Sequence, residues 1–361
     1  MFQGDDGAMV EGKWKVFVFS PYDFGWDTSV VDECYNQLRR QGCEVVLAEN
    51  LTIPTREELL GLGKDADAFM GVQSKKERID EDVLRNAPNL RIIAKYTIGV
   101  DEVDLAAATK QGILVTNAPV ESTAVGVAEN TLALMLALLK KIVLRDKLTR
   151  AGVWRPKEVK GVYMRRGVTV GFIGFGRIAQ EVNKLLEPWG VKRIVYSPHV
   201  PKSVFEQSNV TAVDLETLLI ESDVVLVLTS LTPEKRHMIG ERELKIMKKT
   251  AYLINTARGA LIDEKSLVKA LKEGWIAGAA LDCFEQEPIS LDNPLLKLEN
   301  VILSPHCSDL NEGAGVEVEG VKVATENVLK ALRGELPINI VNPDAIPRWI
   351  ERFGGTAVRL K

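Results

Sequence analysis

The stretch VTVGFIGFGRIAQEVNKLL, residues 168–186, decides the fold of this chain. It opens with a β-rich run and ends in a helical pattern, and the turn between them has the spacing Gly-x-Gly-x-x-Ala. Gly174 allows a tight turn, Gly176 lets the backbone approach a phosphate group, and the small Ala179 lets helix and strand pack closely. Such glycines alone are a weak signal, but a strand before them and a helix after them are typical of a dinucleotide-binding fold.

The start of this predicted helix is the expected phosphate site. The amides of Arg177 and Ile178 would face a pyrophosphate, because a helix N-terminus favours negative charge. The cofactor ribose is usually held by an acidic residue about 20 positions further on, and that position is Ser197. A serine neither grips the ribose hydroxyls strongly nor repels a 2′-phosphate, and His199 and Lys202 follow it. The sequence therefore leaves both NAD and NADP open as the cofactor.

Alternating strand and helix patterns extend on both sides of this stretch. One cycle runs from residue 13 to about residue 117, and a second begins at residue 168. Such alternation predicts parallel strands joined by helical crossovers. We therefore expect an α/β protein with two Rossmann-like or flavodoxin-like parallel-sheet domains and a cleft between them. Residues 1–117 with 307–361 are the predicted substrate-binding, flavodoxin-like domain, and residues 118–306 are the predicted dinucleotide-binding Rossmann domain.

A long apolar helix is predicted between the two cycles, from Glu121 to Leu148. Apolar residues occupy more than one of its faces, so it is either a core helix of one domain or is also buried by a second subunit. The second alternative predicts a homodimer formed through residues 122–150. Near the end of the chain, residues 311–334 are an expected helix. An irregular tail is expected beyond it, marked by Pro337, Pro343 and Pro347.

The composition of the 361 residues excludes several classes of function. Apolar residues make up 46% and charged residues 27%, and the formal net charge of -4 offers no basic footprint for nucleic acid or a membrane surface. The acidic start is unlike a signal peptide, and the longest apolar run is too short to span a membrane. The four cysteines form no CxxC pair, which argues against a disulfide framework and a zinc site. We expect a cytoplasmic protein without a metal.

Three polar residues follow predicted strands of the second cycle: Arg258 in LINTARGALIDE, Glu287 in LDCFEQEP and His306 in LSPHCSD. Loops at the carboxyl ends of parallel strands gather around a ligand. Each residue alone has an ordinary structural explanation. Together they offer an imidazole that exchanges protons near neutral pH, a carboxylate, and a guanidinium whose planar shape matches a carboxylate group.

These segments together resemble the D-isomer-specific 2-hydroxyacid dehydrogenase family, which includes D-3-phosphoglycerate dehydrogenase and glyoxylate/hydroxypyruvate reductase. The resemblance covers residues 66–342 in family order. It rests on KYTIGVDEVD, GVAENTLALML, VGFIGFGRIAQ, LINTARGALIDE, AGAALDCFEQEP and SPHCSD. The resemblance implies an oxidoreductase that transfers a hydride between NAD(P) and the 2-position of a small D-2-hydroxy or 2-keto acid, such as phosphoglycerate, hydroxypyruvate or glyoxylate.

The resemblance also implies roles for individual residues. Arg258 would bind the substrate carboxylate and carbonyl, Glu287 would orient and polarise the histidine, and His306 would be the acid/base. Asp282 would hold the nicotinamide carboxamide. The further predicted cofactor contacts are Gly174, Gly176, Arg177, Ile178, Ser197, Thr229 and Thr256.

The loop YTIGVD of the first domain is the predicted second half of the substrate site. In the family, backbone amides of the matching loop hold the substrate carboxylate, so Thr97, Ile98 and Gly99 are the candidates. Thr97 stands where relatives commonly have glycine. Its side chain could narrow the pocket or add a hydrogen bond.

A nearby segment bears on the choice of substrate. Phosphoglycerate-specific relatives tend to have an arginine in a segment that here reads GVQSKK, with Gln73, Lys75 and Lys76. These lysines would meet a phosphate with less specificity than a guanidinium.

A second interpretation of the fold is an NAD(H)-sensing binding protein, such as the corepressors that share it. The Arg258, Glu287 and His306 set favours catalysis, although such sensors can retain the set. A third interpretation, formate dehydrogenase, is disfavoured because those relatives pair the histidine with glutamine, whereas Glu287 is acidic.

Overall fold

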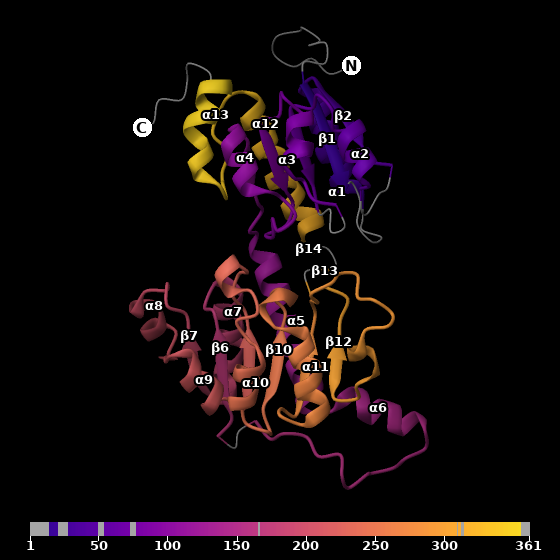
Figure 1. Ribbon diagram of the computed structural model, residues 1–361, viewed down its shortest axis with the longest axis vertical. Coiled ribbons are helices and arrows are strands. Elements are labelled where there is room, and N and C mark those ends of the chain that lie inside the picture. The colour runs from indigo at the N-terminus through magenta and orange to yellow at the C-terminus, as the bar shows by residue number, and fades with distance from the viewer. Residues whose placement is uncertain are drawn as a thin grey trace. The chain divides into compact units, whose positions relative to one another are not determined.

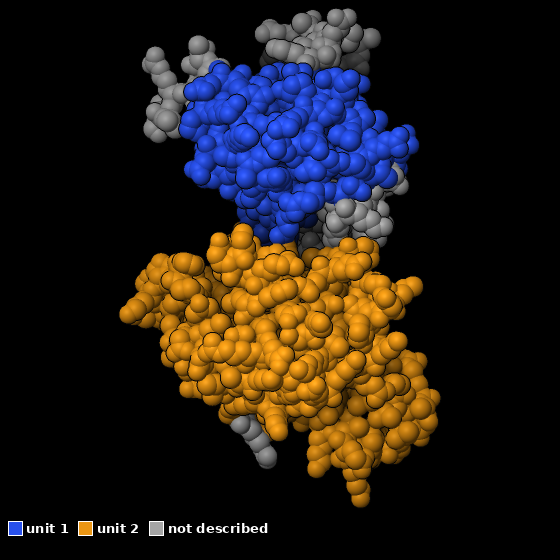
Figure 2. Space-filling view, viewed as in Figure 1, with its two compact units in different colours: residues 1–123, 310–361 blue, residues 124–309 orange. Residues whose placement is uncertain are grey.

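The computed structural model (Figure 1) describes residues 14–20, 28–49, 54–72, 77–164, 167–308, 310–311 and 314–354. The chain forms two compact units, which Figure 2 distinguishes by colour. Unit 1 comprises Met1–Thr123 and Leu310–Lys361, and unit 2 comprises Ala124–Asp309. The chain passes between the units after Thr123 and after Asp309, whereas the sequence places these boundaries after residues 117 and 306.

Unit 1 is built on a sheet of five parallel strands. The strands are β1 (Trp14–Ser20), β2 (Cys43–Leu47), β3 (Ala68–Gly71), β4 (Ile92–Lys95) and β5 (Leu114–Thr116). Their order, β2-β1-β3-β4-β5, is flavodoxin-like, with a switch point between β1 and β3. Every residue of β3 and β4 is buried, as expected for parallel strands with helices on both faces.

Helices cover both faces of this sheet (Figure 1). They are α1 (Thr28–Arg40), α2 (Arg56–Gly61), α3 (Glu81–Asn86), α4 (Leu105–Gln111) and α12 (Val321–Leu332). Apolar side chains of α1 and α12 pack on one face, and those of α2, α3 and α4 pack on the other. Capping explains where two short helices begin, because Asp80 and Asp104 accept amide hydrogen bonds in the first turns of α3 and α4.

The helix predicted over residues 311–334 is wrong at its beginning. Two short antiparallel strands come first, β13 (Leu310–Asn311) and β14 (Ala314–Gly315), followed by a π-helical turn, η5 (Val316–Gly320). Only then does α12 begin. The glycines of this stretch lower its helix propensity, which the apolar pattern did not reveal.

The predicted irregular tail is also wrong. It contains a 3-10 turn, η6 (Pro343–Ala345), and a helix, α13 (Ile346–Phe353). Pro343 lies in the first turn of η6 and Pro347 in the first turn of α13, where the helix makes no use of the N–H group that proline lacks. Trp349 anchors α13, because its ring is fully buried and its Nε1 donates to the carbonyl of Arg91 at 2.9 Å.

Unit 2 is built on a sheet of seven parallel strands. The strands are β6 (Thr169–Ile173), β7 (Lys192–Tyr196), β8 (Thr211–Ala212), β9 (Val224–Val227), β10 (Tyr252–Asn255), β11 (Gly278–Leu281) and β12 (Val301–Leu303). Their order is β12-β11-β10-β9-β6-β7-β8. This is the Rossmann order, and the direction of winding reverses between β6 and β9. The two predicted parallel-sheet α/β domains are confirmed.

Helices cover both faces of the unit 2 sheet, and one further helix, α6, packs on neither face. The helices are α5 (Glu121–Leu139), α6 (Ile142–Arg150), α7 (Arg177–Leu186), α8 (Lys202–Gln207), α9 (Leu215–Glu221), α10 (Glu241–Ile246) and α11 (Glu264–Glu273). Short 3-10 turns are η1 (Glu187–Trp189), η2 (Pro233–Lys235), η3 (Gly259–Leu261) and η4 (Pro294–Lys297). Side chains of α5, α7 and α8 pack on one face of the sheet, and those of α9, α10 and α11 pack on the other.

The single long helix predicted over residues 121–148 is two helices. Lys141 has a φ of 53°, a left-handed conformation that ends α5 and precedes α6. By length and composition α5 could cross a membrane, but 56% of its apolar window is buried in the protein. Its side chains join the core that covers β6 and β9. In contrast, α6 has no buried residue.

Candidate active site

The turn after β6 begins the candidate cofactor site. Gly174 has a φ of 92°, which glycine adopts at no steric cost. A Cβ atom here would lie 2.8 Å from the carbonyl oxygen of Leu228 and 2.8 Å from the Cα of Thr229. The Gly174 amide donates to the carbonyl of Tyr196 at 2.8 Å. The turn is thus held between the ends of β7 and β9, beside the switch point, and only glycine fits.

The helix that follows this turn presents an open N-terminus. Gly176 is the N-cap residue of α7, and no side chain caps this helix. A Cβ added to Gly176 would meet no atom within 4 Å, so the backbone can be approached closely there. Ala179 is fully buried and lets α7 pack near the sheet. These residues fit the pyrophosphate of a dinucleotide, which the amides of Arg177 and Ile178 would meet at the positive end of the helix dipole.

The residue at the ribose position is Ser197, directly after β7. It is half-buried, and its carbonyl accepts a hydrogen bond from the Val200 amide at 3.2 Å. His199 is exposed, and Lys202 is an exposed residue at the start of α8. No carboxylate occupies the position that would repel a 2′-phosphate, so the local chemistry accepts either NAD or NADP.

The two predicted threonine contacts lie in different surroundings. Thr229 follows β9 and accepts a hydrogen bond from the ammonium of Lys235 at 2.9 Å. Thr256 follows β10 and is buried, with its hydroxyl 2.7 Å from that of Thr131 in α5. Thr131 donates its own proton to the Val127 carbonyl, so the Thr256 hydroxyl must be the donor of the pair. The Thr256 side chain therefore connects the end of β10 to α5 by a hydrogen bond.

His306 and Glu287, the predicted acid/base and its carboxylate partner, lie in direct contact. Nδ1 of His306 lies 2.8 Å from both carboxylate oxygens of Glu287, and the two side chains are 28% and 18% exposed. One of these oxygens also accepts the Phe284 amide at 3.0 Å, which fixes the carboxylate in turn. A proton on Nδ1 is therefore held by Glu287, and Nε2 is left to exchange a proton with a ligand. Among the described residues, no partner is hydrogen-bonded to Nε2.

The backbone on both sides of His306 is held by Asp282. This carboxylate is 1% exposed and follows β11. One oxygen accepts the Ser304 hydroxyl at 2.5 Å and the Cys307 amide at 3.2 Å, and the other accepts the Ser308 amide at 3.2 Å and hydroxyl at 2.5 Å. Asp282 therefore sets the turn in which His306 adopts a φ of 55°.

Arg258 lies in a loop pressed against the loop that carries Glu287. The side chain of Asn255 accepts the Ala257 amide at 3.0 Å and donates to the Arg258 carbonyl at 2.9 Å, so this loop is hydrogen-bonded to the last residue of β10. A Cβ on Gly259 would lie 2.0 Å from the carbonyl carbon of Phe284. Arg258, Glu287 and His306 thus follow three neighbouring strands, β10, β11 and β12, at one edge of the sheet.

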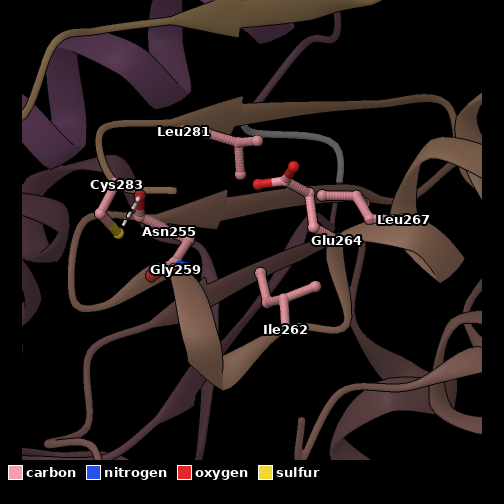
Figure 3. A pocket seen from close by; sticks show the side chains of 7 residues that line it. All are labelled: Asn255, Gly259, Ile262, Glu264, Leu267, Leu281 and Cys283. Carbon is pink, nitrogen blue, oxygen red and sulfur yellow. Dashed lines mark hydrogen bonds between the residues drawn. The ribbon is translucent and has the colours of Figure 1, made fainter. Parts of the chain in front are cut away.

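A small cavity lies beneath the Arg258 and Glu287 loops. Figure 3 shows Gly259, Asn255 and Cys283 around it, with the Cys283 thiol donating to the Asn255 carbonyl at 3.6 Å. Its volume is about 10 Å³, room for roughly one water molecule. The cavity is a packing gap of the sheet edge and not a substrate site.

The predicted substrate loop lies in unit 1, directly after β4. Its three carbonyl oxygens are all used as acceptors: that of Thr97 by the Ala118 amide at 3.0 Å, that of Ile98 by the Asn117 side chain at 2.9 Å, and that of Gly99 by the Thr97 hydroxyl at 3.1 Å. Within the part of the chain that the structure describes, no acceptor meets the amides of these three residues. Such a loop offers N–H donors to an anion.

The structure places the predicted residues in two groups. Thr97, Ile98 and Gly99 share one turn of unit 1, and the remaining site residues share the carboxyl edge of the unit 2 sheet. Gln73, Lys75 and Lys76 lie outside the described residues. Among the residues that are described, no group of histidine, cysteine and acidic side chains could hold a metal ion.

Sequence reasoning missed the residues that support the Asp282 network. Ser304 and Ser308 flank His306, and Asn130 of α5 donates to the Ser308 hydroxyl. The serines on either side of the histidine in LSPHCSD were the one available signal, and nothing near Asn130 in the sequence indicates its partner.

Comparison with known proteins shows what this arrangement is similar to. The sequence profile of the D-isomer specific 2-hydroxyacid dehydrogenase, NAD binding domain, matches residues 132–308. A glyoxylate reductase of Thermofilum pendens is 41% identical over 325 residues, which cover 88% of this chain and 94% of that protein. A D-3-phosphoglycerate dehydrogenase of Methanocaldococcus jannaschii is 43% identical over 316 residues, 86% of this chain and 58% of that protein.

A solved structure carries a cofactor of the predicted kind. An acyclic imino acid reductase, Bsp5, in complex with NADPH and D-Arg, is 25% identical, has a TM-score of 0.76, and is matched over 91% of this chain and 99% of its own. Relatives that are named as reductases and dehydrogenases support an NAD(P)-linked oxidoreductase of 2-hydroxy acids and do not favour the dinucleotide sensor. The chain belongs to the D-isomer-specific 2-hydroxyacid dehydrogenase family.

Proposed function

We propose that this enzyme reduces a small 2-keto acid, of the glyoxylate or hydroxypyruvate kind, to the D-2-hydroxy acid, with His306 as the acid. The observation that carries the proposal is the hydrogen bond from Nδ1 of His306 to Glu287 at 2.8 Å. It places a proton-exchanging ring beside a fixed carboxylate at the carboxyl edge of a Rossmann sheet. The relatives named as glyoxylate reductases support the substrate class.

His306 performs the proton transfer. A nicotinamide held at this edge of the sheet would supply the hydride for the keto carbon. Nε2 of His306 donates a proton to the keto oxygen as negative charge develops there. Glu287 stabilises the charged ring and keeps the proton on Nδ1, so Nε2 is the nitrogen that gives up its proton.

Arg258 and the unit 1 loop orient the substrate. The guanidinium of Arg258 provides a planar pair of donors for the substrate carboxylate and a positive charge for the developing oxyanion. The amides of Thr97, Ile98 and Gly99 would bind a substrate carboxylate, since no acceptor among the described residues meets them and the carbonyls of this turn already accept hydrogen bonds. The Thr97 hydroxyl donates to the Gly99 carbonyl at 3.1 Å, so it would brace the turn and not bind the substrate.

The cofactor contacts follow the same edge of the sheet. Gly174 and Gly176 would leave room for the pyrophosphate, and Ser197 would be the residue nearest to the adenosine ribose. Thr229 and Thr256 offer oxygens at the ends of β9 and β10. Asp282 already accepts four hydrogen bonds from the turn that carries His306, so it would have little remaining capacity to hold the nicotinamide carboxamide.

We also propose that the protein is a cytoplasmic homodimer associated through the α5–α6 region, with a second copy of the chain as the partner. Ile142 and Val143 of α6 are 51% and 58% exposed, and Trp154 and Tyr163 of the following segment are 80% and 58% exposed. Exposed apolar groups so close in sequence are typical of an interface. Val143→Glu should convert the dimer to a monomer in sedimentation velocity, and a wild-type monomer would contradict the proposal.

A substrate panel tests the reaction. Glyoxylate, hydroxypyruvate, pyruvate and 3-phosphohydroxypyruvate are each mixed with NADH or NADPH, and the loss of nicotinamide absorbance is followed. We expect turnover with the unphosphorylated small keto acids and a D-configured product. Tight dinucleotide binding without turnover of any 2-keto acid would contradict the proposal and favour the sensor.

A further inference from the structure

A buried lysine lies at the base of the candidate substrate loop. Lys95 is the last residue of β4 and is 1% exposed. Its ammonium donates to the carbonyl of Val72, just after β3, and to the carboxylate of Glu102, whose side chain is 14% exposed. The ring of Phe19 lies below, with its centroid 5.4 Å from the ammonium. An ammonium so far from water requires compensation, and the carboxylate, the carbonyl and the ring provide it.

The two members of this ion pair bracket the loop. Lys95 precedes Thr97, and Glu102 follows Gly99, so residues 96–101 form a turn whose ends are joined by one side-chain contact. The Val72 carbonyl that accepts from Lys95 also lies 3.4 Å from the Thr97 hydroxyl, so the carbonyl contacts both the ion pair and the loop. The Glu102 backbone is fixed in turn, because its carbonyl accepts the Ile79 amide at 3.0 Å.

We propose that Lys95 and Glu102 are positioning residues for the amides that bind the substrate carboxylate. This inference rests on the proposed function of residues 97–99. The Lys95 ammonium connects the end of β4 with Val72 after β3 and with Glu102 after the loop. These contacts fix both ends of the loop, so its three amides keep the orientation in which they can bind one carboxylate. Neither group touches the reacting atoms, because both are turned into the interior of unit 1.

The alternative is that the pair only stabilises unit 1, and a pair of variants separates the two roles. Lys95→Met alone leaves the Glu102 carboxylate buried without its partner, and it is expected to lower the melting temperature. Lys95→Met with Glu102→Met removes both charges, and apolar replacement of a buried pair is often neutral for stability. Lys110→Met is the matched control, since Lys110 is an exposed lysine of the same unit in a 3.7 Å ion pair with Glu81.

The expected result is a double variant with near wild-type melting temperature and an unchanged Kd for NADPH, but with KM for the keto acid raised on the order of 10-fold to 100-fold, as a misplaced binding group produces. The backbone amides of residues 97–101 should exchange with deuterium faster than in the wild type. Lys110→Met should change none of these quantities.

Two outcomes overturn the inference. A stable double variant with wild-type KM would show that the pair serves stability alone. Unchanged deuterium exchange in residues 97–101 would show that the loop does not depend on the pair, and this readout needs no turnover. A wild-type enzyme that turns over no keto acid would instead contradict the proposed function, and faster exchange in the double variant would then still show the effect of the pair on the loop.

Discussion

The carboxylates of Asp282 and Glu287 act on one histidine in different ways. Asp282 holds the turn of residues 304–308 through two backbone amides and two serine hydroxyls, and Glu287 holds the imidazole ring through Nδ1. The position and the orientation of His306 are therefore both set by the protein itself. If His306 is the acid, as we propose, it would need little reorganisation before it transfers a proton, which is the usual advantage of a supported catalytic group.

Ser197 is the residue at which cofactor preference can be tested. Ser197→Asp places a negative charge beside the expected ribose, where it accepts hydrogen bonds from ribose hydroxyls and repels a 2′-phosphate. The ratio of kcat/KM with NADH to that with NADPH should rise at least about tenfold, which corresponds to roughly 1.4 kcal/mol. Ser197→Asn is the control, because it has nearly the same shape without the charge. An equal shift in both variants, or none in either, would place ribose discrimination elsewhere.

At the scale of elements, the site depends on three loops that follow adjacent parallel strands. The loop after β10 carries Arg258, the loop after β11 carries Glu287, and the loop after β12 carries His306. The first two are in backbone contact at Gly259, and the third is tied to the end of β11 by Asp282. A displacement of one loop is therefore passed to the others.

Gly259→Ala should show this dependence. The added methyl would lie 2.0 Å from the carbonyl carbon of Phe284, so the two loops must separate. Overpacking of this kind costs about 1–3 kcal/mol, and kcat should fall because Glu287 moves with its loop. The melting temperature and kcat of the variant are compared with those of Gly61→Ala, where a Cβ meets no atom within 4 Å. A Gly259→Ala enzyme with wild-type kcat would show that contact between these loops is not needed.

The first turn of α3 should make unit 1 sensitive to acid. Partial burial acts to raise the pKa of Asp80, but hydrogen bonds from Arg56 and the amides of Asp82 and Val83 hold it below the ordinary value. The group thus stabilises the fold fully above its unfolded pKa, and the contribution is lost as the pH falls through the lower folded pKa.

Asp80→Ala measures this contribution. At neutral pH the variant should unfold with a free energy lower by about 1 kcal/mol, the usual value for a lost N-cap. The difference from the wild type should shrink as urea titrations are repeated at lower pH values below 4. A difference that is constant across this range would contradict the assignment to the ionised carboxylate.

At the scale of the whole molecule, the two parallel sheets were predictable, and several connections were not. Buried parallel strands appear as continuous apolar runs, and the glycine-rich turn fixes which sheet is the Rossmann one. The break at Lys141 was not predicted, because apolar residues resume directly after it, at Ile142, Val143 and Leu144. The helix around Trp349 was not predicted, because Pro343 and Pro347 were interpreted as signs of irregular structure, whereas each lies in the first turn of a helical segment.

The candidate site shows the same division. The loops that carry Arg258, Glu287 and His306 follow from strand positions in the sequence. The contacts of Asp282 with Ser308 and of Lys95 with Val72 join residues that are 26 and 23 positions apart, so they arise only when the loops fold together. A sequence motif therefore predicts the candidate catalytic residue, whereas the residues that hold it in place are found only from the tertiary structure.

The central claim, that His306 is the acid of a 2-keto acid reductase, is tested most directly by His306→Ala. The measurement is the steady-state reduction of hydroxypyruvate, together with the Kd for NADPH from nicotinamide fluorescence, and His199→Ala serves as an exposed histidine control. We expect kcat to fall by roughly 10²–10⁴-fold, the usual contribution of general acid catalysis, while the Kd stays within about twofold. A His306→Ala enzyme that keeps wild-type kcat, or that loses turnover only in proportion to NADPH binding, would contradict the account.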